Sequence, residues 1–193
     1  MDEQVRAAMA RWPDVPAAYG WLSLTGQGQW RLQGEPISNT QLLRFIDANY
    51  GGDAQGRWFF QNGPQRVYVT LDAAPYILRT QGQGLALLTH NGRSVGGVDA
   101  WWLDDAGRLY AQTDLGPGLV CGRDTLAVLE TLRDIHGTPL LERLEHDPAS
   151  FPVLLSAEAG GGKPEARAAP VPLRTCPAPD IPRMLGFQRR PQA

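Results

Sequence analysis

Residues 56–78 constrain the fold most strongly, because no other stretch of the chain has such consistent strand chemistry. An aromatic run favours a pleated, half-buried surface, and Asn62-Gly63-Pro64 breaks it with residues typical of turns. The returning run alternates, so its apolar side chains share one face while Arg66 and Tyr68 share the other. The pattern predicts an antiparallel hairpin. The residues whose role can exceed packing are Arg57, Phe59, Arg66 and Tyr68.

Other elements follow from turn signals and hydrophobic spacing. Apolar runs bounded by turn residues predict hairpins at 21–32 and 100–112, the second around the turn Asp104-Asp105-Ala106-Gly107, and a buried strand at 85–88. Helical spacing predicts helices at 3–12, 38–50 and 124–136, and a further helical piece after Thr138-Pro139. Ser38 has capping-box spacing to Gln41. We expect an α+β fold whose antiparallel hairpins form one or two twisted sheets, packed by the helices at 38–50 and 124–136.

The composition changes at residue 156. The last 38 residues hold seven of the sixteen prolines and none of the six tryptophans, so little apolar surface offsets the entropy of ordering them. Six basic and three acidic residues also make this segment positive, while the preceding part is acidic. The sequence therefore predicts a globular domain at 1–155 and a flexible Pro/Gly-rich linker and tail at 156–193.

A weak internal repeat lies within residues 20–80. Residues 28–36 and 56–64 have glycine, tryptophan, glutamine and proline in step at an offset of 28. The alternative to duplication is that each unit is a strand begun by a glycine after a tight turn.

The two similar segments belong to a longer stretch that resembles known protein families. A Gly-x-Trp strand leading to Gly34-Glu35-Pro36-Ile37, a helix, a second Gly-x-Trp strand and residues 71–76 (Leu-Asp-Ala-Ala-Pro-Tyr) resemble uncharacterised proteobacterial families of unknown function. The resemblance spans roughly residues 20–112. It implies a small α+β protein with repeated strand and helix units, for which signalling or ligand sensing has been suggested, and it transfers no catalytic position.

Charge and cysteine usage restrict the class of protein. A net charge of -2 gives no general attraction to nucleic acid or to an anionic membrane. Cys121 and Cys176 have no disulfide-framework or zinc-ligand spacing, and the three histidines are too scattered for a metal site. No secretory signal or membrane span is recognisable. We expect a cytoplasmic protein without a metal or cofactor.

Two residues are candidates for nucleophilic chemistry. Residues 92–96 (Gly-Arg-Ser-Val-Gly) match the GxSxG elbow, which requires a strand before Ser94 and a helix after it. The residues after Ser94 have the pattern of another strand rather than a helix, which favours a glycine-rich connection between strands over a nucleophile elbow. Cys121 precedes a predicted helix, where the dipole and Arg123 can lower a thiol pKa, although an inert buried cysteine is the commoner case.

Binding candidates are the aromatic strands and one glycine-rich loop. The stretch 116–124, which contains Arg123, is the best place for a small anion, since free N–H groups gather at a helix start. Trp101 and Trp102 point to opposite faces of one strand, so we expect one of them to lie exposed in a groove or interface.

The expected function is a non-enzymatic ligand-binding or protein-binding, regulatory module. Its partner would be a small molecule or a protein rather than nucleic acid or a membrane. The alternatives are a small hydrolase or thiol enzyme using Ser94 or Cys121, and a homodimer closed by an exposed Trp101 or Phe59.

Overall fold

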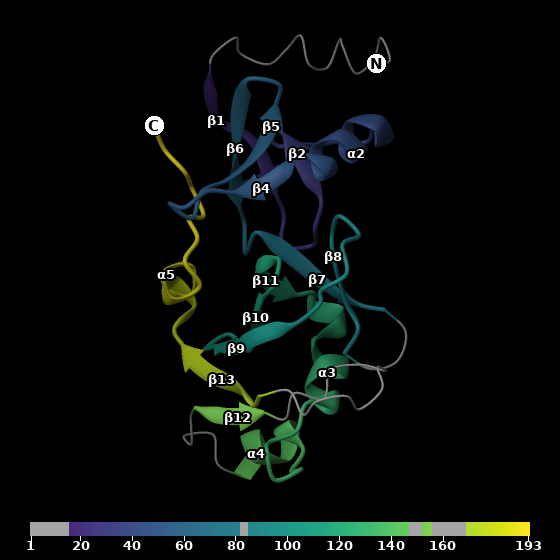
Figure 1. Ribbon diagram of the computed structural model, residues 1–193, viewed down its shortest axis with the longest axis vertical. Helices are drawn as coiled ribbons and strands as arrows, with labels where there is room; N and C mark the ends of the chain where they lie inside the picture. Colours follow the sequence, from purple (N-terminus) through teal and green to yellow (C-terminus); the bar gives the residue numbers. More distant parts are fainter. Residues whose placement is uncertain (1–15, 82–84, 147–151, 156–168) are drawn as a thin grey trace. The chain divides into compact units, whose positions relative to one another are not determined.

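A computed structural model gives the fold and describes residues 16–81, 85–146, 152–155 and 169–193. These residues form two compact units (Figure 1): unit 1 takes the residues up to Pro75 together with Gly186–Ala193, and unit 2 is Tyr76–Leu185. Each unit is built on one β-sheet, so the expected α+β class is confirmed, and of the one or two sheets expected the described residues form two. The helix predicted at 3–12 lies outside the described residues.

Unit 1 contains a mixed six-stranded sheet with the strand order β3-β2-β1-β6-β5-β4. Its elements are β1 (Ala17–Leu24), β2 (Trp30–Leu32), β3 (Glu35–Pro36), α2 (Thr40–Ala48), β4 (Tyr50–Gly52), β5 (Trp58–Asn62) and β6 (Gln65–Leu71). The predicted first and central hairpins are confirmed as the antiparallel pairs β1/β2 and β5/β6. The sheet also contains a parallel pair, β1 with β6, that no turn residue in the sequence marks.

Helix α2 covers the sheet face to which the alternating apolar residues of β6 point. Val67 is fully buried and lies opposite Phe60 of β5, whose ring meets the ring of Phe45 on α2 with centroids 5.4 Å apart. The helix cap differs from the expectation, because Asn39 rather than Ser38 is the N-cap. Its side-chain oxygen accepts hydrogen bonds from two backbone N–H groups of the first turn, which is what an N-cap asparagine does.

Unit 2 contains a mixed seven-stranded sheet with the order β12-β13-β9-β10-β11-β7-β8. Its strands are β7 (Tyr76–Thr80), β8 (Leu87–Thr89), β9 (Val98–Asp104), β10 (Leu109–Thr113), β11 (Gly116–Val120), β12 (Val153–Leu155) and β13 (Val171–Cys176). Its helices are α3 (Gly122–Thr131), α4 (Leu140–His146) and α5 (Ile181–Met184), with a 3-10 turn at Ala178–Asp180. The predicted hairpin β9/β10 is confirmed, and α3 starts and ends earlier than the predicted 124–136.

The expectation of a flexible tail is wrong for residues 169–193. Strand β13 pairs in parallel with β9 and antiparallel with β12, so it lies inside the sheet of unit 2. Further on, the N–H of Gln188 donates to the Gly56 carbonyl, and the N–H of Leu71 donates to the Arg189 carbonyl, both at 2.8 Å. The segment has few large apolar side chains, yet Leu173 is fully buried. The backbone of the segment also forms sheet hydrogen bonds, which amino-acid composition does not reveal.

One turn motif recurs five times in the described residues, at 25–29, 53–57, 89–93, 104–108 and 134–138. In each copy the first residue is Thr or Asp, and its backbone N–H donates to the carbonyl of the fifth residue. Its side chain accepts the backbone N–H of the fifth residue. The fourth residue is always glycine, with φ between 74° and 86°. This geometry is that of a type I turn followed by a left-handed glycine.

The turn also bears on the internal repeat. Gly28 and Gly56, which begin the two similar segments, both occupy the fourth position of this turn. Gly107, which begins a weaker echo of the same pattern, does so as well. The structure therefore agrees with the explanation that each unit is a strand begun by a turn glycine.

Candidate binding face

Four of the predicted site residues come together on the face of the unit 1 sheet opposite α2. Phe59 and Tyr68 are directly cross-strand neighbours, and their ring centroids lie 5.8 Å apart. The guanidinium carbon of Arg57 lies 4.8 Å from the Tyr68 ring centroid, and that of Arg66 lies 4.7 Å from the Phe59 ring centroid. Each arginine thus crosses diagonally to the ring on the other strand, which is the reach expected of long side chains on a hairpin.

Tyr19 of β1 completes this group and was missed in the sequence. Its ring stacks on that of Tyr68 with centroids 4.7 Å apart and an interplanar angle of 6°. The strand register shifts between Ala18 and Leu22, where Gly20 adopts a φ of 74°. Such a bulge breaks the period-two pattern, so alternation alone could not assign Tyr19 to this face. We call the five residues Tyr19, Arg57, Phe59, Arg66 and Tyr68 the arginine-aromatic face.

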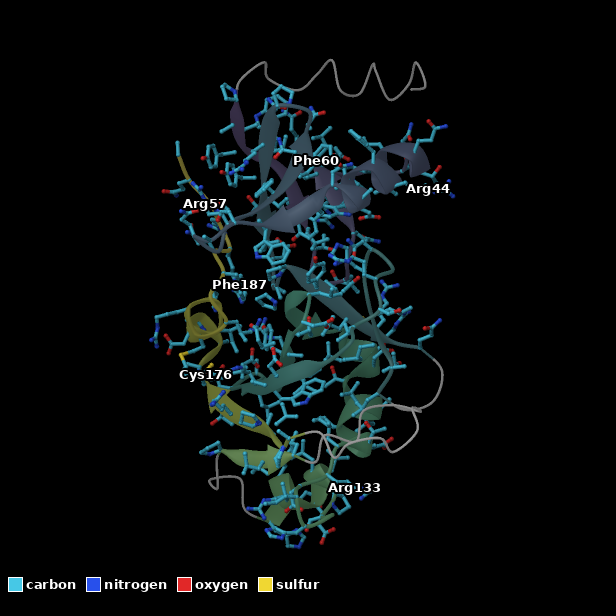
Figure 2. The ribbon with its side chains drawn as sticks, in the orientation of Figure 1. Arg44, Arg57, Phe60, Arg133, Cys176 and Phe187 are labelled. Carbon is cyan, nitrogen blue, oxygen red and sulfur yellow. The ribbon has the colours of Figure 1, made fainter. Side chains whose placement is uncertain are left out.

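Turn 53–57 sets the position of Arg57. The Asp53 carboxylate accepts the backbone N–H groups of Gln55 and Arg57 at 3.0 Å and the Arg57 Nε at 2.8 Å. Burial pushes the pKa of Asp53 upward, but these hydrogen bonds and the guanidinium charge outweigh it and hold the pKa below its ordinary value. Figure 2 labels Arg57 on the side of unit 1 away from Arg44, which is exposed on α2.

Trp101 and Trp102 are both buried and do not form part of a binding surface. The expectation that one of them lies exposed is wrong, because their exposed fractions are 3% and 5%. They do point to opposite faces, but the missed strand β13 runs beside β9 and places Arg174 opposite Trp102. The Arg174 guanidinium carbon lies 5.4 Å from the Trp102 ring centroid. Both tryptophans belong to the packing of unit 2.

Ser94 does not occupy a nucleophile elbow. Residues 89–93 form the recurring turn, and Ser94 bridges back to Leu88 in antiparallel fashion. The chain then runs past Gly96 and Gly97, whose N–H groups donate to Asp114, into strand β9. The strand-to-helix step that strains and presents a catalytic serine is therefore missing.

The glycine-rich stretch 116–124 is not an anion-binding loop. Residues 116–120 form strand β11 between β10 and β7, so their backbone groups form hydrogen bonds within the sheet. At Gly118 a Cβ would lie 2.7 Å from the Leu78 side chain, which explains the glycine by close packing. Cys121 is buried, and its N–H donates to the Leu78 carbonyl. Arg123 is exposed and sits near Asp124, with its Nε 3.7 Å from the carboxylate.

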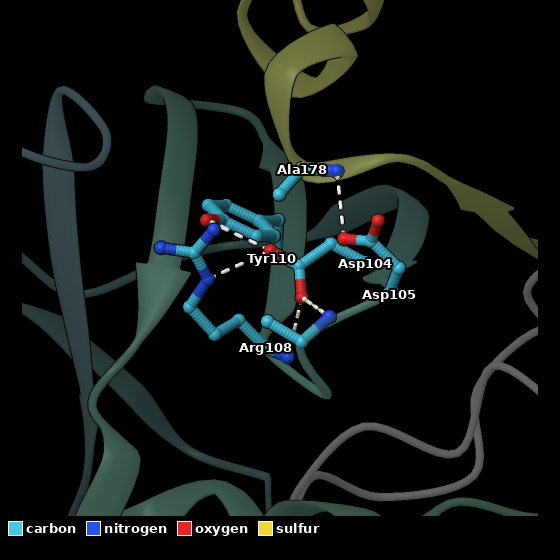
Figure 3. Close-up of polar contacts among 6 residues, drawn as sticks. Asp104, Asp105, Arg108, Tyr110 and Ala178 are labelled. Atoms are coloured by element: carbon cyan, nitrogen blue, oxygen red, sulfur yellow. Dashed lines mark hydrogen bonds and ion pairs between the residues drawn. The ribbon is translucent and has the colours of Figure 1, made fainter.

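The Asp104-Asp105 pair is a turn, as the sequence predicts (Figure 3). Asp104 accepts the N–H groups of Ala106 and Arg108, and its second oxygen accepts the Arg108 Nε at 2.7 Å. Asp105 accepts the N–H of Ala178 at 2.9 Å, so the two carboxylates hold different partners. Nearby, burial and then the charges of Asp180, Asp104 and Asp105 raise the pKa of the Cys176 thiol, which keeps it protonated at neutral pH.

His90 lies in the turn at 89–93. Burial, and then the charge of Arg79, lowers its pKa to about 3. Its Nδ1 accepts the N–H of Ile77 at 3.4 Å. A histidine of this kind stays neutral across physiological pH and does not serve there as a proton donor.

The described residues contain no group of three or more His, Cys, Asp or Glu side chains arranged to hold a metal ion. In the same ranges no helix has the length and apolar character needed to span a bilayer, and the longest, α3, has ten residues.

The two sheets define an α+β protein, and its family follows from sequence. Residues 1–192 match the model of the family described as "Protein of unknown function (DUF2946)", and the chain belongs to that family. This confirms the expected membership of an uncharacterised family. The comparison with curated proteins found no match.

Two solved structures are similar to the chain. A DUF1285 family protein from Silicibacter pomeroyi DSS-3 is 14% identical, with a TM-score of 0.49, and the match covers 94% of this chain and 98% of that one. A DUF1285 family protein from Shewanella baltica OS155 is 16% identical, with a TM-score of 0.43, over 54% of this chain and 86% of that one.

Proposed function

We propose that this protein is a non-enzymatic, regulatory binding module, and that the arginine-aromatic face of unit 1 is its recognition surface. The observation that carries the proposal is the pair of arginines held across aromatic rings, Arg57 over Tyr68 and Arg66 over Phe59. Arginine and tyrosine are enriched among residues that dominate binding energy. A guanidinium already placed on a ring also loses less side-chain entropy when a ligand arrives.

The competing enzymatic proposal has less support. Ser94 is exposed but is followed by a loop and a strand, and Cys121 is buried with its backbone tied to β7. An activity-based serine or cysteine probe that labels either residue in folded protein would favour the enzyme instead.

The binding proposal includes a compartment and a class of partner. We place the protein in the cytoplasm, with a small molecule or a protein as its partner rather than nucleic acid or a membrane. The net charge of -2 supports this choice, because it provides no long-range attraction to polyanionic surfaces.

The test compares retention on immobilised full-length protein. Wild type and Arg44→Gln should retain the same cell proteins or small molecules, whereas Phe59→Ser and Arg66→Gln should lose them. Arg44 is the matched control because it is an exposed arginine on α2, at the other face of the same sheet. If the variants of the arginine-aromatic face retain the same set as wild type, this face is not the recognition surface.

A second copy of the chain is one partner that this test can reveal. Phe59 is half-buried on the arginine-aromatic face and is the residue that a homodimer would bury. Light scattering should then give a dimer for wild type and a monomer for Phe59→Ser. A monomer for both proteins would exclude self-association through this face.

A further inference from the structure

The two arginines that lie over aromatic rings have N–H donors that the rings do not use. A guanidinium that lies over an aromatic ring uses its flat face, and its in-plane N–H groups remain for hydrogen bonds. Arg57 donates its Nε to Asp53, and Arg66 donates no side-chain hydrogen bond to the described residues. These donors suit a planar, two-oxygen acceptor, which a guanidinium binds through two parallel hydrogen bonds.

The positive charge of the arginine-aromatic face favours an anionic ligand. Asp53 neutralises Arg57 in part, but none of the described carboxylates forms an ion pair with Arg66. The described residues of unit 1 carry six arginines and four acidic residues, so the described part of this unit is positive. An acidic ligand therefore meets complementary charge on this face.

The rings favour a carboxylate ligand over a nucleic acid. Single-stranded nucleic acid gains sequence-tolerant affinity by stacking bases on free aromatic faces. Tyr68, at the centre of the group, contacts the Tyr19 ring and the Arg57 guanidinium and is only 4% exposed. It offers no ring face to a base, whereas the exposed Arg66 offers its N–H edges to an acid.

The spacing of the arginines fits an extended chain. Because Gln61 pairs with Arg66 and Phe59 pairs with Tyr68, Arg57 and Arg66 differ by four residues along the hairpin. At about 3.4 Å per residue the backbones of the two arginines lie about 14 Å apart along the strands. Each guanidinium leans toward the Phe59–Tyr68 pair midway between them, so the guanidiniums lie closer together than the backbones. In an extended peptide, side chains at alternate positions point to the same side and lie about 7 Å apart.

We propose that the arginine-aromatic face binds an extended acidic segment of a partner protein, with carboxylates at alternate positions. This inference rests on the proposed function and names the partner class for the same face. The free N–H edges of Arg66 bind one carboxylate, and the remaining donors of Arg57 bind another.

The probe is a fluorescein-labelled decapeptide of alternating Glu and Ser, titrated with full-length protein and followed by anisotropy at low salt. We expect Arg66→Gln to weaken binding about tenfold or more, because a charge-assisted bidentate contact is lost. Arg66→Lys, which keeps the charge but not the fork, should lose an intermediate amount, and Arg44→Gln should stay within about twofold of wild type. A thermal melt of each variant checks that it is folded.

Three outcomes overturn the inference. They are equal affinity for an alternating Gln and Ser decapeptide, unchanged affinity in folded Arg66→Gln, and tighter Arg66-dependent binding of a uridine dodecamer than of the acidic peptide. If lysate proteins are still retained through Phe59 and Arg66 while the acidic peptide fails, the partner class is wrong and the recognition surface stands.

Discussion

Turns 53–57 and 104–108 have the same sequence pattern and the same hydrogen bonds but different surroundings. In both, an aspartate accepts two backbone N–H groups and the Nε of the arginine four residues later. The Asp53 side chain is 11% exposed, whereas that of Asp104 is fully buried. Arg57 lies over Tyr68, while Arg108 lies farther from Tyr110, at 5.9 Å.

The difference between these two turns lies in the strands around them. Turn 104–108 precedes β10 in a sheet that β13 extends beyond β9, and Asp105 accepts the backbone N–H of Ala178 in the same C-terminal segment. Turn 53–57 leads into β5, where Phe59 and Tyr68 form the arginine-aromatic face. The aspartate-arginine turn therefore occurs in both sheets as a structural element, and the two copies differ in how deeply the aspartate is buried.

The glycines of the two turns provide the largest expected contrast. Gly56 and Gly107 both have a φ of 74°, but a Cβ at Gly56 would lie 2.3 Å from the Gly186 carbonyl oxygen, whereas one at Gly107 meets nothing within 4 Å. Gly107→Ala should cost about 1 kcal/mol of unfolding free energy for its left-handed backbone, and Gly56→Ala about 4 kcal/mol because the clash adds to it. Urea unfolding measures both, and equal losses would contradict the packing described at Gly56.

The aspartates give the next contrast. Asp104→Ala removes a fully buried carboxylate that accepts the N–H groups of Ala106 and Arg108, and we expect it to cost about 3 kcal/mol. Asp53→Ala should cost about 1 kcal/mol, because water can reach part of that site. Thermal and urea unfolding of the two variants measure the difference. A larger loss for Asp53→Ala would show that the burial difference does not control the strength of this turn.

His90 extends the comparison to a turn headed by threonine. Its pKa is about 3 in the folded protein and about 6.5 in the unfolded chain, so between these values the unfolded chain binds the extra proton. Stability should therefore fall as pH falls below about 6.5, by about 2 kcal/mol at pH 5. Unfolding of His90→Gln over the same range should show a flatter pH dependence. Asp53 has a lowered pKa, so the stability it contributes is lost only as pH falls below about 4, and it adds little to the change between about pH 6.5 and pH 5.

Arg123 provides the smallest expected effect. It was a binding candidate from sequence, but it is 67% exposed and its Nε lies 3.7 Å from Asp124. Arg123→Gln should change stability by less than about 0.5 kcal/mol and leave acidic-peptide binding unchanged. A loss of peptide affinity comparable to that of Arg66→Gln would mean that binding is not confined to the arginine-aromatic face.

Local elements were predictable because their causes are local. Alternation in residues 66–71 and the break at Asn62-Gly63-Pro64 predicted β5 and β6 as a hairpin, and the structure confirms it. The same alternation placed Arg66 and Tyr68 on the face opposite the buried valines, so most of the arginine-aromatic face was found from sequence.

Long-range pairings were not predictable. The parallel pairs β1/β6, β7/β11 and β9/β13 join segments that no short turn connects. The missed strand β13 explains the error for the pair Trp101 and Trp102, since its Arg174 side chain lies over the Trp102 ring and a hairpin alone does not reveal that neighbour. Tyr19 was missed for a different reason, because a bulge at Gly20 hides it from a period-two pattern.

Unit 1 is assembled from two distant parts of the chain, which matters for the order in which it can form during translation. The ribosome makes β1 to β6 first, but Gln188 and Arg189, which bond to Gly56 and Leu71, emerge only after all of unit 2. Until then, the Gly56 carbonyl and the Leu71 N–H of the nascent unit 1 lack their final hydrogen-bond partners. A stop codon before residue 186 would damage the unit that is synthesised first.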